Sequence, residues 1–125
     1  MGELEAWYRE AKSVADFYVV YIREAHPTDG WQVQANVRQG VLVPTARSEE
    51  DRAQAASKCA KELKISIPVL IDNMNDEVER AYRGWPDRIY VVAKNGMIGF
   101  QGEPGPRGFR PLDAKAALSK MTAGP

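Results

Sequence analysis

Cysteine and histidine are almost absent from this sequence, because each occurs once among 125 residues, as Cys59 and His26. A single cysteine excludes a disulfide within the chain and is compatible with a reducing compartment. One cysteine and one histidine cannot form a zinc site of the usual type. We therefore expect no bound metal or cofactor.

The sequence also lacks a net charge and a long apolar run. Seventeen basic residues balance 17 acidic ones, which gives no electrostatic reason to expect nucleic acid or an anionic membrane as partner. Residues 14–22 are the longest nearly apolar stretch and include Asp16, whereas a membrane span needs about 20 residues. The acidic N-terminus has no basic region of a signal peptide. We expect a soluble, cytoplasmic protein.

Several catalytic motifs are missing as well, including HExxH, the Walker A loop and GxGxxG. Residues 72–76 begin like a calcium loop but lack the following glycine and the distant glutamate. We interpret them as the solvated start of a helix.

The hydrophobic pattern predicts one α/β domain over residues 1–125. Apolar residues at helical spacing predict a helix over residues 3–14, and continuous apolar runs predict interior strands at 17–22 and 67–71. Ser48 and Asp51 form an approximate capping box at the start of a second helix. The inward positions expected on that helix are Ala53, Ala56, Ala60 and Leu63.

The remaining elements follow from turn signals. Residues 76–82 are expected to form a short helix with Val78, Ala81 and Tyr82 inward. Asn95-Gly96 predicts a hairpin with a type I′ turn between strands at 88–94 and 97–102. Residues 102–110 form a Gly/Pro-rich loop before a final helix that begins at Pro111. Its inward positions are Ala114, Ala117, Leu118 and Met121.

This order, α-β-α-β-α-β-β-α, resembles a thioredoxin-like fold that is truncated at its N-terminus, with a mixed sheet and helices on both faces. A more specific resemblance comes from "FYVVYIREAHPTDGW" at 17–31, which is similar to the iodothyronine deiodinase family, its bacterial members most of all. Further segments match in order: "RSEEDR" at 47–52, "PVLIDNM" at 68–74, "AYRGWPDRIYVV" at 81–92 and "GFQGEPGPRGF" at 99–109.

The resemblance implies an oxidoreductase that reductively removes iodine from an iodinated phenol, with a small aromatic substrate and an external thiol reductant. In the family a selenocysteine or cysteine attacks the halogen from a loop between the first strand and first helix. The resemblance places the start of this chain inside that helix, so the first strand and the nucleophile are expected to be absent and the chain to be inactive as written.

Glu24 and His26 match family positions that bind the phenolic ring and transfer protons. A histidine suits this role because its ordinary pKa is near 6.5. Two other interpretations stay open: His26 before Pro27 as a loop-capping residue, and Glu24 as a surface carboxylate paired with Arg23 or Arg47.

The missing strand has a structural consequence as well. The thioredoxin arrangement is expected to place it between the strands at 17–22 and 67–71. Three outcomes stay open: the two strands pair directly, another chain fills the gap as in a homodimer through exposed strand edges, or the chain is a fragment.

Other positions bear on the substrate and on redox chemistry. Family members that act on thyroid hormone carry a histidine and a basic residue where this chain has Ala46 and Pro104, and Arg107 and Arg88 are the candidates for the substrate-side loop. Cys59 is either a buried small hydrophobe or a resolving thiol. Pro68 lies where thioredoxin-like proteins often place a cis-proline.

Three functions therefore remain: a deiodinase-like oxidoreductase, a non-catalytic binding or assembly protein, and a thiol reductase that depends on Cys59.

Overall fold

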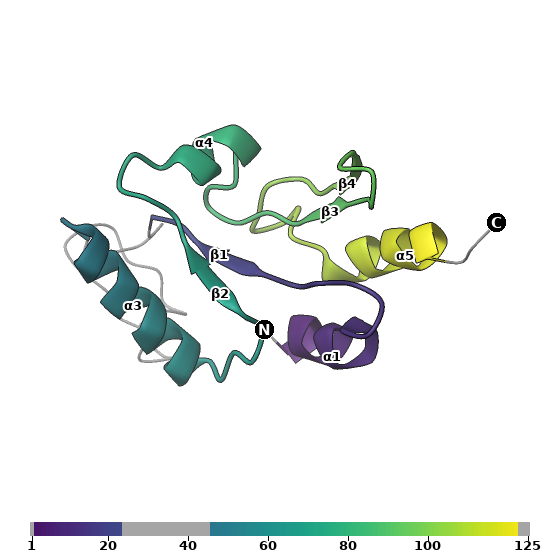
Figure 1. Cartoon of the computed structure of the whole chain (residues 1–125), viewed down its shortest axis with the longest axis horizontal. Helices are drawn as coiled ribbons and strands as arrows, with labels where there is room; N and C mark the ends of the chain where they lie inside the picture. The colour runs from purple at the N-terminus through teal and green to yellow at the C-terminus, as the bar shows by residue number, and fades with distance from the viewer. Residues whose placement is uncertain (1, 24–45, 123–125) are drawn as a thin grey trace. The chain divides into compact units, whose positions relative to one another are not determined.

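The computed structural model describes residues 2–23 and 46–122, which form helices and short strands in alternation (Figure 1). The elements are α1 (Gly2–Ala11), β1 (Val19–Tyr21), α3 (Glu49–Glu62), β2 (Val69–Ile71), α4 (Glu77–Tyr82), β3 (Tyr90–Val92), β4 (Ile98–Gln101) and α5 (Pro111–Thr122). The α/β class is confirmed. The residues group into two compact units. One is Tyr18–Tyr82. The other combines the two segments that flank it, the first ending at Phe17 and the second beginning at Arg83.

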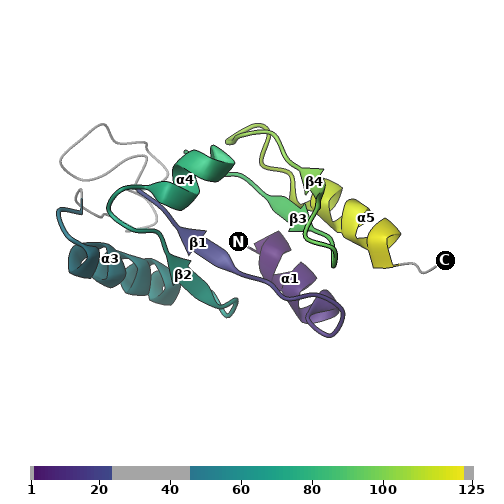
Figure 2. The same ribbon diagram turned by 45° about the horizontal axis from the view of Figure 1, so that its top comes forward.

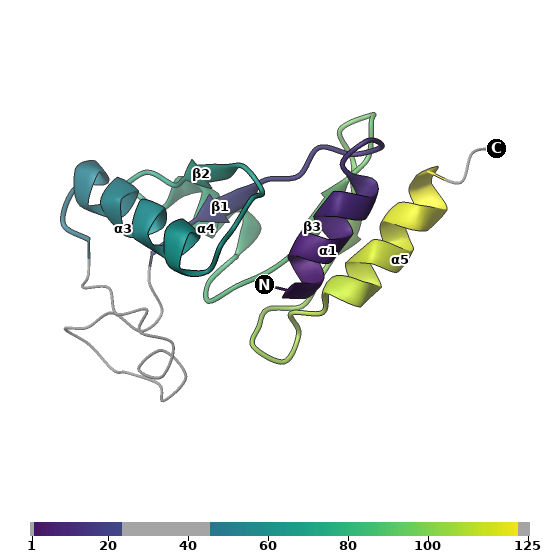
Figure 3. The same ribbon diagram turned by 90° about the horizontal axis from the view of Figure 1, so that it is seen from below.

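The flanking segments build a unit from α1, α5 and the β3–β4 hairpin. Figure 3 shows α1 lying alongside α5. The core of this unit contains Trp7, Val91, Ala114 and Leu118, which confirms the inward positions predicted for Ala114 and Leu118. The Trp7 ring also meets Phe17 edge-on, with 4.9 Å between ring centroids. Met121, also predicted inward, is exposed.

The hairpin forms where it was predicted, but its turn is not type I′. That type needs positive φ at both central residues, and here only Gly96 has it, at 86°. The amide of Gly96 donates to the carbonyl of Ala93, and the amide of Ala93 donates to the carbonyl of Met97. These bonds define a type I turn followed by a glycine bulge, a geometry that lets Asn95 keep negative φ and accept from the amide of Met97 with its side chain.

In the unit Tyr18–Tyr82, β1 and β2 pair directly and in parallel, with Val19 opposite Val69 and Tyr21 opposite Ile71. Figure 2 shows the two strands side by side, with α3 along β2. Direct pairing of the two strands was one of the three outcomes left open, and it is the one that the structure shows. The Ile67–Pro68 bond is trans, because the cis bonds of the described chain are at Pro86 and Pro106.

The expected single mixed sheet is not what the described residues form. They contain a two-stranded parallel sheet, β1–β2, and a two-stranded antiparallel sheet, β3–β4. A continuous sheet would require a ladder of backbone hydrogen bonds between the pairs, and the described strands bond only within their own pair.

Two helices bury a face that overlaps the predicted one only in part, with Ala53, Ala60, Leu63 and Val78 half-buried. On α3 the buried residues are Arg52, Ala55 and Ala56, so of the four predicted positions only Ala56 is buried. On α4 the buried residue is Glu79, whereas Ala81 and Tyr82 are exposed. In both helices a charged side chain lies inward because it has polar partners there.

Candidate functional site

Polar groups gather where β1 and β2 end together. The carbonyl of Tyr21 accepts the last ladder hydrogen bond from the amide of Asp72, at 2.9 Å. Arg23 follows β1 and Asp72 follows β2 directly. Ligands of α/β sheets bind beyond the carboxyl ends of parallel strands, so this edge is the candidate site of the unit.

Asp72 holds the start of α4. The residue is 2% exposed. Its carboxylate accepts hydrogen bonds from the amides of Val78 at 3.0 Å and Glu79 at 2.9 Å. These are amides of the first helical turn, which have no partner within the helix. The prediction of a solvated helix start at residues 72–76 is therefore wrong for Asp72: its charge is buried because backbone amides compensate it.

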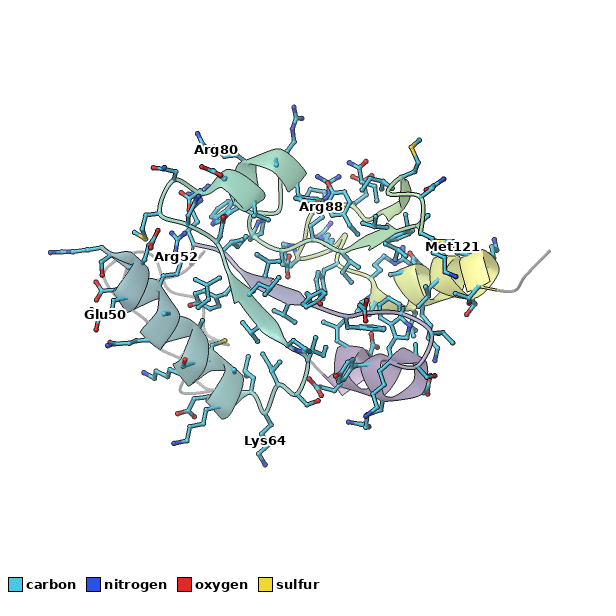
Figure 4. The ribbon with its side chains drawn as sticks, in the orientation of Figure 1. Glu50, Arg52, Lys64, Arg80, Arg88 and Met121 are labelled. Atoms are coloured by element: carbon cyan, nitrogen blue, oxygen red, sulfur yellow. The ribbon has the colours of Figure 1, made fainter. Side chains whose placement is uncertain are left out.

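Arg52 joins α3 to the same connection. Figure 4 shows it pointing from α3 toward the segment between β2 and α4, whereas Glu50 points away from it. Its Nη1 donates to the carbonyl of Asn73 at 2.6 Å and lies 2.9 Å from Oδ1 of Asp76. The contact with Asp76 is an ion pair without hydrogen-bond alignment, and Nε of Arg52 is buried without a hydrogen-bond partner. The Arg52 guanidinium is thus a buried positive charge that binds the segment between β2 and α4.

Arg23 and Glu79 form a second ion pair at this edge. Nη2 of Arg23 lies 3.3 Å from Oε1 of Glu79, and the exposed fractions of their side chains are 49% and 10%. Arg23 follows β1 and Glu79 lies on α4, so the pair ties the end of β1 to the helix that Asp72 caps.

The two residues predicted to carry catalysis, Glu24 and His26, lie outside the described residues. Glu24 follows Arg23 directly and His26 lies three positions after it in the sequence, so the chain leads from the described edge into both. Their roles stay predictions.

Arg88 and Arg107, predicted for a substrate-side loop, have different surroundings in the unit that contains β3 and β4. Nε of Arg88 donates to the carbonyl of Gly102 at 2.6 Å, and its guanidinium lies 5.4 Å from the centre of the Tyr90 ring. This side chain fastens the start of the 102–110 loop to β3. Arg107 is exposed on that loop.

Asp87 lies against the same loop. Its carbonyl accepts from the amide of Gly105 at 2.8 Å, and its carboxylate Oδ1 is buried without a hydrogen-bond partner. Burial raises the pKa of Asp87, and the nearby Gly105 backbone amide opposes that shift in part. A Cβ at Gly105 would overlap the Asp87 carboxylate, so glycine is required for this approach.

Cys59, the third candidate, is a half-buried cysteine on α3. In the described parts of the chain, His, Cys, Asp and Glu side chains form no group of three that could hold a metal ion. Residues 2–23 and 46–122 also contain no helix that is long and apolar enough to cross a membrane.

Sequence reasoning missed the charged residues that the structure buries, Glu5, Arg52, Asp72 and Glu79, and the half-buried Asp87. A signal was present for two of them. Arg52 precedes Ala55 and Ala56 by three and four positions, and Glu79 lies seven positions after Asp72 at the start of the next helix. A charged residue in phase with an apolar stripe indicates a buried polar partner.

These features define an α/β chain with charged residues gathered at the carboxyl ends of a parallel strand pair. Its sequence matches the iodothyronine deiodinase family over residues 3–122, and the chain belongs to that family.

Individual relatives agree with this assignment. The chain is 40% identical over 127 aligned residues to the thyroxine 5-deiodinase of Sparus aurata, an alignment that covers 99% of the chain and 46% of the relative. It is 33% identical to the type I iodothyronine deiodinase of Xenopus laevis, over 96% of the chain and 45% of the relative. The chain therefore spans less than half the length of these relatives.

Proposed function

We propose that this chain is the acid–base part of a thioredoxin-like enzyme that reductively removes iodine from an iodinated phenol. The observation that carries the proposal is the family match over residues 3–122. The β1–β2 pair supports it, because its carboxyl ends lead into the segment with Glu24 and His26. Both features are compatible with ligand binding at the end of a parallel sheet.

The proposed reaction is a two-electron reduction. A selenol or thiol nucleophile takes up iodine as the carbon–iodine bond breaks, and the ring carbon receives a proton. Two equivalents of an external thiol then release iodide from the nucleophile and form a disulfide. The nucleophile belongs to a segment outside these 125 residues, and this chain supplies ring binding and proton transfer.

In this proposal His26 donates or accepts the proton, and Glu24 fixes the imidazole tautomer by accepting from its other nitrogen. A carboxylate partner of this kind orients a histidine and raises its basicity. The chain has no other histidine, so no second imidazole in it can replace His26.

The first experiment reads the DNA upstream of Met1, where the proposal expects an in-frame apolar strand and a codon for cysteine or selenocysteine. A stop codon without such a strand would contradict it. In the protein with that segment present, His26→Ala should lower the rate of iodide release by about 10²–10⁴-fold, the usual span for an acid–base group. A change below about threefold would assign His26 a structural role.

A second candidate function is a non-catalytic assembly protein, and one observation favours it. Leu70 and Ile71 of β2 are 49% and 44% exposed, although strands of parallel sheets are usually buried on both faces. This candidate expects the 125-residue chain to be a homodimer through its strand edges. A stable monomer by multi-angle light scattering would count against this homodimeric form of the candidate.

A further inference from the structure

Asp87 has a carboxylate oxygen that the fold buries with little compensation. Its Oδ1 is buried and has no hydrogen-bond partner. Among the described residues, no cation forms an ion pair with this side chain. Removal of an ionised carboxylate from water is unfavourable unless a cation or hydrogen-bond donors compensate it, whereas the neutral acid loses much less solvation. The surroundings of Asp87 therefore suit the neutral acid better than the ionised form.

The 102–110 loop lies directly against this carboxylate. A Cβ at Gly105 would overlap it, so the loop backbone and the Asp87 side chain are in contact. The amide of Gly102 donates to the carbonyl of Ile89 at 2.9 Å, and the amide of Gly105 donates to the carbonyl of Asp87 at 2.8 Å. These two hydrogen bonds continue the pairing of β3 and β4 into the loop. The Gly105 bond is the farther of the two from the strands, so the loop can open there while the Gly102 bond stays formed.

The charged groups near Asp87 do not compensate it. Arg88 follows it directly, but its guanidinium donates to the carbonyl of Gly102 at 2.6 Å and lies 5.4 Å from the centre of the Tyr90 ring. The other charged residues of the loop and of the segment before Asp87 are exposed: Arg83, Glu103, Arg107 and Arg110. Burial raises the pKa of Asp87, and the Gly105 backbone amide opposes that shift in part. Opening of the loop at Gly105 would let water reach the carboxylate and would remove this burial.

We propose that Asp87 is a pH-sensitive latch of the 102–110 loop: the neutral carboxylic acid keeps the loop closed at Gly105, and ionisation of the acid opens it. A carboxyl group that holds its proton more tightly in the closed loop than in the open loop favours the closed loop at low pH. This advantage is complete below the ordinary pKa of about 3.9 and is lost as the pH rises through the higher pKa that Asp87 has in the closed loop. The latch requires neither the deiodination reaction nor any residue outside those that the structure describes.

Amide hydrogen exchange of the full chain, measured by NMR, tests the latch. The protection factor of the Gly105 amide should be highest at low pH and should fall as the pH rises through the pKa of Asp87. The pKa itself is read from the side-chain carboxyl carbon resonance. The total fall in protection should be about tenfold for each unit by which this pKa exceeds the ordinary value. A fall of less than about twofold would overturn the proposal, because linkage would then be too weak to move the loop.

Two substitutions separate the Asp87 carboxylate from the other acidic group of this region. Asp87→Asn is neutral at every pH, so its Gly105 protection should stay near the low-pH value of the original protein across the whole range. The matched control, Glu103→Gln, removes a carboxylate from an exposed position of the same loop and should keep the pH dependence. A pH dependence that persists in Asp87→Asn, or that disappears in Glu103→Gln, would assign the opening to another group and overturn the proposal.

Low concentrations of urea distinguish opening of the loop from unfolding of the whole unit. Local opening exposes little surface, so exchange at Gly105 should barely depend on urea, whereas exchange through global unfolding rises steeply with it. A steep dependence at Gly105 would show that Asp87 acts on the fold as a whole and would contradict the latch. If Asp87→Asn does not fold, the pH titration of the original protein still decides the question. None of these measurements uses iodide release, so a failure of the proposed function leaves their outcome unaffected.

Discussion

Removal of the Arg52 charge should destabilise the unit Tyr18–Tyr82 by about 2–3 kcal/mol. The variant is Arg52→Met, which keeps most of the aliphatic packing of a side chain that is 5% exposed. It removes a hydrogen bond of 2.6 Å to the carbonyl of Asn73, and a hydrogen bond to a charged group contributes about 1.5–3 kcal/mol.

The ion pair with Asp76 adds less than a fully buried pair would. The Asp76 side chain is 26% exposed, so water can hydrate its carboxylate once Arg52 is gone. The usual cost of breaking a buried pair, about 3–5 kcal/mol, is therefore an upper limit. Apolar packing of the methionine further offsets the loss.

Urea unfolding followed by circular dichroism measures the change. At a slope of about 1–3 kcal/mol per molar urea, the expected loss shifts the midpoint by about 0.7–3 M. Arg47→Met is the matched control, because Arg47 is exposed one residue before the cap of the same helix, and it should change stability by less than about 0.5 kcal/mol.

A third variant separates the two contributions. Asp76→Asn removes the ion pair but keeps the bond from Arg52 to Asn73, and asparagine tolerates the φ of 56° at this position. It should cost less than Arg52→Met. If Arg52→Met changes stability by less than about 0.5 kcal/mol or increases it, the guanidinium is not a structural centre of this unit and the reasoning is refuted.

Three further predictions concern other parts of the chain. Gly105→Ala should lower the melting temperature because its Cβ would displace the Asp87 carboxylate, and Asp87→Ala in the same protein should recover part of the loss; an unchanged melting temperature in Gly105→Ala would contradict the packing. Asp87→Asn should be more stable than the original protein at pH 7. The native pKa of Asp87 is raised, so its ionised form costs stability above that pKa, and the gain should vanish below the ordinary value of about 3.9 in melting curves recorded across the pH range. Cys59→Ser should leave thiol-dependent turnover of the longer protein unchanged, and loss of turnover would favour the Cys59-dependent reductase.

The local elements were predictable because their causes are local. Ser48 caps α3 by accepting from the amide of Asp51 at 3.1 Å, as its spacing from that residue indicated. Pro111 begins α5, and Gly96 sits in the hairpin turn. In each case a few neighbouring residues determine the backbone, so their order in the sequence is sufficient information.

The inward faces of α3 and α4 were not predictable in the same way. A hydrophobic pattern assigns Arg52 and Glu79 to solvent, because it considers only whether each side chain is apolar. It does not consider which polar groups of other elements lie opposite that side chain in the fold. Arg52 lies inward because carbonyls of residues 72 and 73 end a strand there, and Glu79 because Arg23 is opposite. These partners are 20 or more positions away in the sequence, so a local pattern does not reveal them.

Placement of these charges has a common physical cause. Where parallel strands end, their last carbonyls have no partner in the ladder. The first amides of the following helix have no partner within the helix. Buried side chains must supply the missing partners of both groups. Asp72 supplies acceptors for the amides of α4 and Arg52 supplies a donor for the carbonyl of Asn73. The same edge is followed in the sequence by Glu24 and His26. A change in Arg52 is therefore expected to act on the stability of the unit Tyr18–Tyr82, because the carbonyl of Asn73 then loses the donor that replaces its ladder partner.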